Sequence, residues 1–243
     1  MDRVAVAFSG GADSAFLLRA LSDALGRGNV LAVTVSSEFG TRPEMREAAR
    51  LARSLGVRHA VIKARLLSDP RIRANTPLRC YYCKKKIFSL IKKEAARRGY
   101  RTVVDASNLD DRKVYRPGRL ALKQLGILSP LEEAGMTKAR IRALSKKAGL
   151  PTWDKPANAC LATRIPCGTP ITRDVLLRVE KAEELVRRDI GQGQLRVRAH
   201  GDIARIEVER RQMKKALSLG KKTIRGLRAL GFKHITLDTE GYR

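Results

Sequence analysis

The feature that most constrains this 243-residue chain is a short apolar run, residues 4–8, that leads directly into two adjacent glycines. The glycines belong to the segment Ser9-Gly10-Gly11-Ala12-Asp13-Ser14, and apolar residues at helical spacing follow over 13–25. A strand, a tight glycine turn and a helix in this order direct several backbone N–H groups outward beside the positive end of the helix dipole. The sequence therefore predicts a phosphate-binding loop. Its residues are Ser9, Gly10, Gly11, Asp13 and Ser14.

This loop does not match the two common nucleotide fingerprints. No lysine follows the glycines as in G-x-x-x-x-G-K-[ST], and the spacing of a dinucleotide-binding loop is also absent. The plain alternative is a strand-to-helix turn in which Asp13 or Ser14 only caps the helix. Because both glycines stand at the first turn of an α/β pattern, we favour the anion site.

Short apolar runs alternate with helical patterns through residues 1–150. Strands are expected over 4–8, 30–35, 59–64 and 102–106, and helices over 13–25, 43–55, 84–98 and 137–148. Strands that are apolar throughout and separated by helices are typical of a parallel sheet covered on both faces. We therefore predict a doubly wound α/β domain over residues 1–150.

Beyond this domain the order of elements changes. Residues 150–156 have the composition of a linker. A helix capped by Thr172 is expected to run to about 188, followed by strands over 195–199 and 203–208, a helix over 213–230 and a strand over 232–237. Linker included, residues 151–243 are predicted to form a second, smaller α+β domain.

The chain is strongly basic, with 51 Lys+Arg against 24 Asp+Glu and a formal net charge of +27. The excess is +18 over residues 1–156 and +9 over residues 157–243, so neither end is a basic tail. It is steepest over residues 65–101, where twelve Lys/Arg face only Asp69 and Glu94. Such a charge suits nucleic acid, an anionic membrane surface or a small polyanionic substrate, and a solvated surface is the plain explanation.

The chain contains no run of 18 apolar residues, and its start lacks the regions of a secretory signal. We therefore expect a cytoplasmic protein without a membrane partner. Four cysteines in that compartment indicate metal or redox chemistry rather than a disulfide framework.

The cysteines are Cys80 and Cys83, in a C-x-x-C pair expected on a loop before the helix over 84–98, and Cys160 and Cys167 downstream. Three interpretations compete. A four-thiolate zinc site would need an unusually long spacing between Cys160 and Cys167. A thioredoxin-like pair would need the strand-to-helix turn that the phosphate loop already occupies. The third is an iron–sulfur cluster on three thiolates, with one iron open to a ligand such as sulfide.

Residues 9–14 resemble the PP-loop signature S-G-G-x-D-S of the ATP pyrophosphatase superfamily at every fixed position. Members of that superfamily split ATP between the α and β phosphates and adenylylate a substrate oxygen, leaving pyrophosphate in the loop. The resemblance implies a ligase, an amidotransferase or a sulfur transferase that uses Mg²⁺ and ATP.

Further blocks along almost the whole chain resemble the LarE family of ATP-dependent sulfur transferases, which build a nickel-pincer nucleotide. They include Arg79-Cys80-Tyr81-Tyr82-Cys83-Lys84, Tyr115-Arg116-Pro117-Gly118, Ser129-Pro130-Leu131, Trp153-Asp154-Lys155-Pro156-Ala157, Cys160-Leu161-Ala162-Thr163-Arg164 and Arg196-Val197-Arg198. The resemblance implies that a carboxylate of pyridinium-3,5-dicarboxylate mononucleotide becomes a thiocarboxylate. It also implies a homo-hexamer and a substrate-binding or oligomerisation role for residues 151–243.

The resemblance implies two possible sources of sulfur. In some family members the residue that corresponds to Cys160 gives up its own sulfur and is left as dehydroalanine. In others, cysteines that correspond to Cys80, Cys83 and Cys160 hold a [4Fe-4S] cluster that passes on a sulfide from a donor. Because this chain has all three cysteines, we favour the cluster type, with Cys160 catalytic and Cys167 a bystander. Zinc remains the alternative.

The anionic substrate suits a basic site. The family resemblance points to Arg196 and Arg198, which would share one face of a strand, as residues that hold the substrate phosphate. Arg164, four residues after Cys160, is a candidate to bind the AMP or the activated carboxylate. Asp110 and Asp111 are candidates to assist Mg²⁺. One acid in the helix after Thr172 resembles a metal-contacting carboxylate of the family. The candidates are Glu180, Glu183 and Glu184. Salt bridges, turn formation and solvated surface are the plain alternatives for these residues.

Two other functions remain open. Some tRNA thiolases combine a PP-loop with a three-cysteine cluster, and the net charge would suit an RNA backbone. Because the charge is dispersed and aromatic residues make up only 5% of the chain, we do not expect nucleic acid as the partner. A basic nucleic-acid-binding module with a zinc knuckle would leave the phosphate loop unused.

Overall fold

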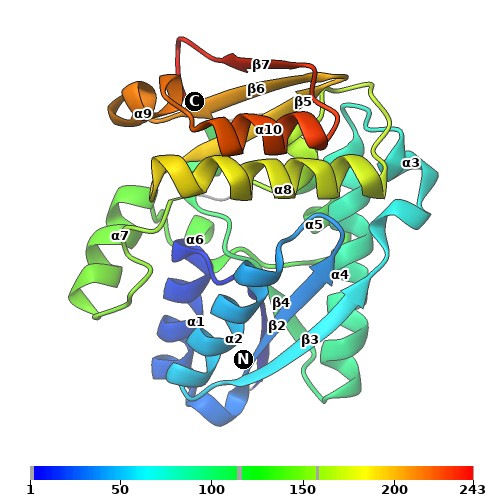
Figure 1. Cartoon of the computed structure of the whole chain (residues 1–243). Coiled ribbons are helices and arrows are strands. Elements are labelled where there is room, and N and C mark those ends of the chain that lie inside the picture. The colour runs from blue at the N-terminus through cyan, green and yellow to red at the C-terminus, as the bar shows by residue number, and fades with distance from the viewer. Residues whose placement is uncertain (1–2, 114–116, 157–158, 243) are drawn as a thin grey trace. The chain divides into compact units, whose positions relative to one another are not determined.

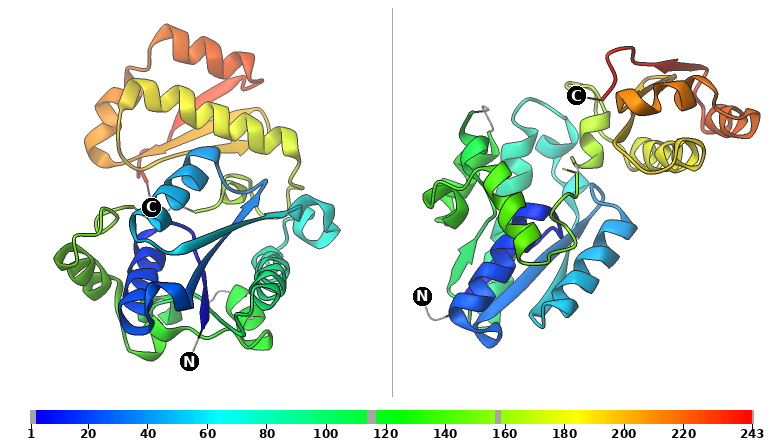
Figure 2. Two further views of the ribbon diagram at one scale, coloured as in Figure 1. Left: turned by 90° about the horizontal axis from the view of Figure 1, so that it is seen from below. Right: turned by 90° about the vertical axis from the view of Figure 1, so that its left-hand side faces the viewer.

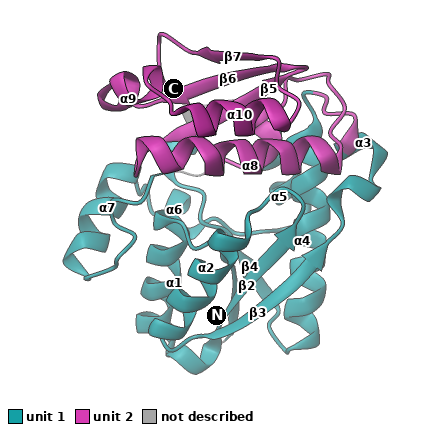
Figure 3. Cartoon of the chain, viewed as in Figure 1, with its two compact units in different colours: residues 1–72, 77–158 teal, residues 73–76, 159–243 magenta. Residues whose placement is uncertain are grey.

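The computed structural model describes residues 3–113, 117–156 and 159–242. Tyr115, Arg116 and Ala157 of the family-like blocks lie outside these described residues. The chain divides into two compact units (Figure 3): unit 1 comprises residues 1–72 and 77–158, and unit 2 comprises residues 73–76 and 159–243. The change from unit 1 to unit 2 thus comes after residue 158, whereas the sequence suggested a boundary at 150.

Unit 1 contains a parallel four-stranded sheet with the strand order β3-β2-β1-β4. Its strands are β1 (Val4–Ala7), β2 (Val30–Ser37), β3 (Arg58–Ala64) and β4 (Thr102–Val104). In the register Val4 pairs with both Val30 and Thr102, so β1 is an interior strand. The α/β sheet is parallel as predicted, and β1 and most of β2 are buried, whereas the edge strand β3 alternates between buried and exposed residues.

Helices cover both faces of this sheet, with α1 and α4 on opposite sides of the strands (Figures 1 and 2). The helices of unit 1 that cover the sheet include α1 (Ala12–Leu25), α2 (Arg42–Ser54), α4 (Arg79–Arg97), α5 (Gly118–Gln124) and α7 (Lys138–Lys147). Val4 and Val6 pack with residues of α1, α2 and α7, whereas Ala5 packs with residues of α4 and α5. This alternation follows from the two-residue period of a strand. The chain changes face after β3 and places β4 on the other side of β1, so the fold is doubly wound with its switch point between β1 and β4.

Unit 2 contains a mixed three-stranded sheet. Its strands are β5 (Leu195–His200), β6 (Ile203–Val208) and β7 (His234–Leu237), and its helices are α8 (Arg173–Ile190), α9 (Met213–Leu217) and α10 (Lys221–Ala229). β5 and β6 are antiparallel, and β7 is parallel to β6. Helix α8 contacts both β5 and α10, and Leu195, Val197 and Ala199 alternate inward from β5. Residues 73–76 belong to unit 2 because buried Asn75 donates to the carbonyl oxygens of Pro166 and Thr169 at 2.8 and 2.9 Å.

Two helix caps were predicted from the sequence and are confirmed. The Thr137 hydroxyl accepts from the N–H of Arg140 at 3.3 Å, and the Thr172 hydroxyl accepts from the N–H of Val175 at 3.2 Å. The structure adds short helices that were not predicted, because one or two turns show too little periodicity. These are α3 (Pro70–Arg73), α5, α6 (Pro130–Glu133) and the turns η1 (Arg27–Asn29), η2 (Leu66–Ser68), η3 (Leu109–Lys113), η4 (Leu161–Arg164) and η5 (Arg210–Gln212).

Two predictions about helices are wrong. The cysteine pair lies within α4 rather than on a loop before it, because the N–H groups of Tyr81 and Tyr82 already donate to Leu78 O and helical hydrogen bonding begins there. The helix predicted over 213–230 is two helices, α9 and α10, separated by residues 218–220. The N–H of Gly220 donates to Asp189 Oδ2 at 2.9 Å, a contact 31 positions away in sequence that fixes the new helix start. No helix in the described ranges is both long and apolar enough to cross a membrane.

Candidate functional site

The predicted phosphate loop lies at the carboxyl end of β1, where the chain enters α1. Gly10 has a φ of 73°, and a Cβ built on it would lie 3.0 Å from both the Cα and the Cβ of Ala48 in α2. The Ser9 and Ser14 hydroxyls lie 3.1 Å apart, and the N–H of Gly11 is 3.3 Å from Ser9 Oγ. Only glycine fits position 10 without strain, because both the backbone angle and the space exclude a side chain.

Asp13 lies in the first turn of α1, and it is the charged residue of the loop segment. Its Oδ2 accepts from Asn108 Nδ2 at 3.2 Å, whereas its buried Oδ1 has no hydrogen-bond partner among the residues described. Burial raises the pKa of Asp13 and outweighs the charge of Lys138 and the Asn108 hydrogen bond, which lower it. A carboxylate oxygen kept buried without a donor costs stability.

The segment after β4 lies at the switch point, where open α/β sheets bind ligands. The N–H of Asn108 donates to Asp111 Oδ2 at 3.1 Å, and the N–H of Asp110 donates to Asn108 Oδ1 at 3.0 Å. Asp110 Oδ2 also accepts from the N–H of Lys138, the first residue of α7, at 2.9 Å. The Asp111 carboxylate therefore supports the turn, whereas the Asp110 carboxylate contacts the start of α7. Both lie in the segment whose Asn108 contacts Asp13.

A residue that the sequence analysis did not select also contacts the loop. Lys155 Nζ donates to Gly10 O at 3.2 Å and forms an ion pair with Glu47 of α2 at 2.6 Å. Lys155 stands 145 positions after Gly10. The one sequence signal that could have identified it is its place in the family-like block Trp153-Asp154-Lys155-Pro156.

Cys80 and Cys83 lie one turn apart on α4, so their side chains share one side of the helix. Cys80 is exposed and Cys83 is half-buried, and Arg79 Nη2 lies 3.8 Å from Cys80 Sγ. Cys160 and Cys167 belong to unit 2, where Cys160 immediately precedes η4. Within either unit, the described residues include no cluster of three or more His, Cys, Asp or Glu side chains placed to hold a metal ion.

Cys167 is held at the surface of unit 2. Its Sγ donates to Asn75 O at 3.4 Å, and the neighbouring Gly168 N–H donates to the same oxygen at 2.9 Å. These contacts attach residues 73–76 to the segment that follows Cys160.

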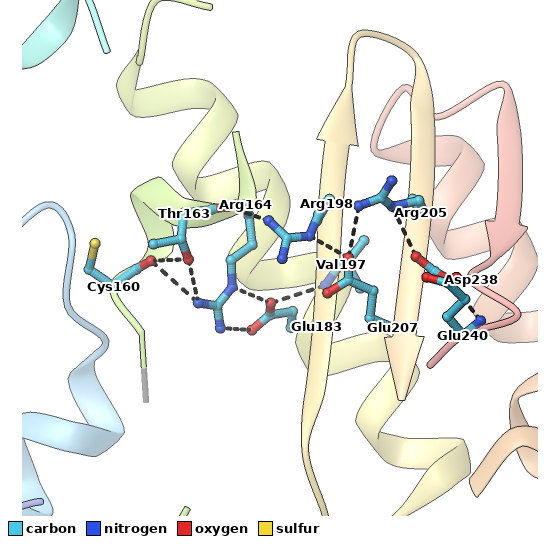
Figure 4. A network of polar contacts seen from close by, with 10 residues as sticks. All are labelled: Cys160, Thr163, Arg164, Glu183, Val197, Arg198, Arg205, Glu207, Asp238 and Glu240. Carbon is cyan, nitrogen blue, oxygen red and sulfur yellow. Dashed lines mark hydrogen bonds and ion pairs between the residues drawn. The ribbon is translucent and has the colours of Figure 1, made fainter. Parts of the chain in front are cut away.

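Buried Arg164 holds the backbone on both sides of Cys160, and Figure 4 shows its contacts with Cys160 and Glu183. Its Nη1 donates to Ala159 O at 2.7 Å and to Cys160 O at 3.3 Å, while its Nε donates to Glu183 at 2.8 Å. Burial lowers the pKa of Arg164, but the hydrogen bonds and charge of Glu183 more than offset this and raise it overall. Glu183 Oε1 also accepts from the Val197 N–H at 3.1 Å, so this pair ties the Cys160 segment to β5.

The expected arginine pair of β5 lies on one face of the strand, and both side chains are half-buried. Arg198 donates to Glu207 and, through Nη1, to Thr163 O at 2.8 Å. Arg205 also donates to Glu207, at 3.0 Å, so two guanidinium groups share one buried carboxylate (Figure 4). The Arg196 guanidinium lies 4.3 Å from the centre of the Tyr242 ring.

The three acids of α8 differ in their surroundings. Glu183 is paired with Arg164, Glu180 is half-buried, and Glu184 is exposed. Glu183 therefore has a structural partner that the sequence did not reveal.

Together, the doubly wound sheet and the glycine loop at its switch point define an α/β protein whose first strand-to-helix turn has the sequence of a PP-loop. No model of a known protein family matches the sequence. Individual relatives do match it. The chain is 40% identical over 243 residues to the pyridinium-3,5-bisthiocarboxylic acid mononucleotide synthase of Lactiplantibacillus plantarum, with all of this chain and 88% of that protein covered.

Two uncharacterized proteins also match over nearly their full length. Slr1717 of Synechocystis is 38% identical over 246 residues, with 91% of that protein covered. MJ0830 of Methanocaldococcus jannaschii is 30% identical over 241 residues, with 91% covered. The chain belongs to the LarE family of ATP-dependent sulfur transferases.

Proposed function

We propose that this enzyme adenylylates a carboxylate of pyridinium-3,5-dicarboxylate mononucleotide and replaces the AMP by sulfur, giving a thiocarboxylate. The observation that carries the proposal is the 40% identity, over the whole chain, to a synthase named for the corresponding bisthiocarboxylic acid. The loop at Gly10, which excludes a side chain, supports the ATP-binding part of it.

The activation step uses the phosphate loop. Residues 9–14 bind the β and γ phosphates of ATP through backbone N–H groups and the start of α1. A substrate carboxylate oxygen attacks the α-phosphorus, the α–β phosphoanhydride bond breaks, and pyrophosphate leaves. AMP then leaves the carbonyl carbon far more readily than oxide or hydroxide would. Mg²⁺ accompanies ATP, and the oxygen-rich segment of Asp110 and Asp111 suits a hard cation of this kind.

The sulfur step depends on the cysteines. Cys80, Cys83 and Cys160 form a thiolate set of the type that binds iron–sulfur clusters, and the one-turn spacing on α4 suits two of its ligands. We propose that these three residues hold a [4Fe-4S] cluster. When bound, such a cluster supplies a sulfide on the iron that lacks a protein thiolate. Arg164 fixes the backbone around Cys160 through its hydrogen bonds to Ala159 O and Cys160 O.

The substrate phosphate is proposed to bind at Arg196 and Arg198. Arg198 and Arg205 both donate to the buried carboxylate of Glu207, and Arg196 lies on the same face of β5 as Arg198. Guanidinium groups on one face suit a phosphate dianion. We further propose that the enzyme is a cytoplasmic homo-hexamer that requires no nucleic acid.

The test is an anaerobic reaction with ATP, Mg²⁺, sulfide and the dicarboxylate nucleotide, followed by mass spectrometry. AMP and pyrophosphate should form in equal amounts together with the thiocarboxylate. Release of ADP and phosphate would contradict the adenylylation step. Thiolation of tRNA in place of the nucleotide would replace the proposed substrate.

The cluster is tested separately by analysis of iron and sulfide. Cys80→Ala should lose the iron and the repeated turnover, whereas Cys167→Ala should keep both. If Cys80→Ala still transfers one sulfur per chain and Cys160 loses the elements of H₂S, the sulfur comes from Cys160 itself. Stoichiometric zinc without iron would favour the zinc alternative.

A further inference from the structure

The phosphate loop lacks a cation of its own. ATP brings several negative charges to residues 9–14, yet the charged side chain in that segment is Asp13, which is negative. In loops of the G-x-x-x-x-G-K-[ST] type, a lysine directly after the glycines contacts the β and γ phosphates and offsets part of their negative charge. Here position 14 is followed by Ala15 and Phe16. Any lysine that serves this loop must therefore come from elsewhere in the chain.

Lys155 is placed to do this. Its ammonium lies 3.2 Å from Gly10 O, so it stands against the backbone that forms the turn. Its own main chain is fixed at two points: Arg142 Nη2 donates to Lys155 O at 3.2 Å, and the N–H of Lys155 donates to Thr152 O at 3.1 Å. Lys155 is thus positioned by α7 and by a turn rather than by a flexible segment.

The other partner of Lys155 can be exchanged. Glu47 lies 2.6 Å from Lys155 Nζ, but its side chain is 48% exposed. Exposed ion pairs are weak, because solvent screens them. An ammonium has three N–H donors, so Lys155 can keep Gly10 O and donate to a phosphate oxygen as it leaves Glu47. A pyrophosphate group, with several charges, competes well against one screened carboxylate.

We propose that Lys155 binds the β,γ-diphosphate of ATP, and afterwards the pyrophosphate product, in the loop of residues 9–14. Glu47 holds the lysine when the loop contains no anion. The proposal rests on the proposed function, because it assumes that this loop binds ATP. It assigns to a residue 145 positions away the task that a neighbouring lysine performs in other phosphate loops.

The experiment measures the binding of magnesium pyrophosphate and of AMP by calorimetry to the full chain. Lys155→Met should weaken pyrophosphate binding about 10- to 100-fold, as expected for the loss of one charge-assisted hydrogen bond. AMP binding should change by less than about twofold, because AMP lacks the β phosphate. Lys155→Arg should restore most of the affinity. Lys147→Met, at an exposed lysine in the last turn of α7, is the control for loss of one positive charge in unit 1.

A second variant avoids any effect of Lys155 on folding. Glu47→Gln should bind pyrophosphate several-fold more tightly, because the competing carboxylate is gone. In the Lys155→Met background, Glu47→Gln should give little gain in pyrophosphate affinity. A general effect of charge would be additive and would not produce this coupling between the two positions.

Three results would overturn the inference. The first is pyrophosphate binding by Lys155→Met as tight as that of the Lys147→Met control. The second is an equal loss of AMP and pyrophosphate binding, which would show that Lys155 only supports the loop. The third is additivity of the Glu47 and Lys155 changes. If the unmodified chain binds no pyrophosphate, the proposed function fails with it, whereas the first three results leave the proposed function intact.

Discussion

The predicted phosphate loop of unit 1 and the arginine network of unit 2 both offer hydrogen-bond donors to anionic groups. The loop does so with backbone groups, and the network does so with side chains. The loop takes its residues from six consecutive positions and relies on backbone N–H groups and a glycine angle. The network joins Arg164 to Glu183 and Arg198 to Glu207, pairs that stand 19 and 9 positions apart. Among the residues that the structure describes, Asp13 Oδ1 of the loop has no donor, whereas Glu207 of the network accepts from two guanidinium groups.

This difference predicts different responses to substitution. A site made of backbone N–H groups loses function when the backbone geometry changes. The effect on stability should be smaller, because few side-chain contacts depend on that geometry. A network of half-buried and buried ion pairs loses stability when one partner is removed, because the remaining charge is left without compensation. The following predictions test this contrast in order of expected effect.

The largest effect is expected from Arg164→Met. Arg164 and Glu183 have side chains that are 8% and 14% exposed, so loss of the arginine leaves a nearly buried carboxylate. The free energy of unfolding should fall by about 3–5 kcal/mol, measured by urea denaturation. Adding Glu183→Gln should recover part of this loss, because the uncompensated charge is then removed.

The matched control for Arg164 is an exposed pair. Arg19 and Asp23 have side chains that are 41% and 60% exposed, and Arg19→Ala should cost no more than about 1 kcal/mol. Equal costs at Arg164 and Arg19 would show that the network does not stabilise unit 2.

The next effect is the loss of ATP cleavage in Gly10→Val. The φ of 73° costs an L residue about 1–2 kcal/mol, and the new Cβ would press against Ala48 at 3.0 Å. Formation of AMP and pyrophosphate should fall about 100-fold or more, as when a preorganised donor is removed from an active site. Gly40→Val is the control, because the nearest atom to a Cβ there is Glu44 Oε2 at 4.0 Å. Unchanged ATP cleavage in Gly10→Val would refute the phosphate loop.

A smaller effect separates the two arginines of β5. Arg196 stacks on Tyr242, and a half-buried cation–π contact of this kind contributes about 0.5–2 kcal/mol, which Arg196→Gln should remove from the free energy of unfolding. If it binds the substrate phosphate, the KM for the dicarboxylate nucleotide should rise about tenfold. Arg198→Gln should lower stability as well, because Glu207 is buried. If Arg196→Gln leaves the KM unchanged, Arg196 does not bind the substrate phosphate and only packs on Tyr242.

The smallest effect concerns the pH dependence of stability at Asp13. Its pKa in the folded chain is above the ordinary carboxyl value because of burial. The folded state therefore keeps the Asp13 proton to a higher pH than the unfolded state does. Ionisation of Asp13 consequently lowers stability as pH rises from the ordinary carboxyl pKa through the raised pKa of the folded state. Asp13→Asn should consequently be slightly more stable than the unmodified chain at neutral pH. The gain should vanish as pH falls below the ordinary carboxyl range, where both side chains are uncharged. A variant less stable at neutral pH would contradict the unpaired position of Asp13 Oδ1.

The sequence by itself determined the features that depend on neighbouring residues. The apolar runs fixed the parallel sheet, the two glycines and Asp13 defined the loop, and Thr137 and Thr172 marked helix starts three residues from the N–H groups that they accept. These features depend only on local hydrogen bonds and on the burial of apolar residues within one segment. They can therefore be recognised in a window of a few residues.

Only the tertiary structure decided which partners the charged side chains contact. The contacts of Lys155 with Gly10, of Arg164 with Glu183 and of Gly220 with Asp189 join positions 145, 19 and 31 apart. Lys, Arg and Glu carry long side chains with many rotamers, and the chain offers 51 basic residues for 24 acids. Their partners are therefore selected by the packing of helices on sheets, which brings particular head groups together after the local elements have formed, and no local pattern in the sequence records that selection.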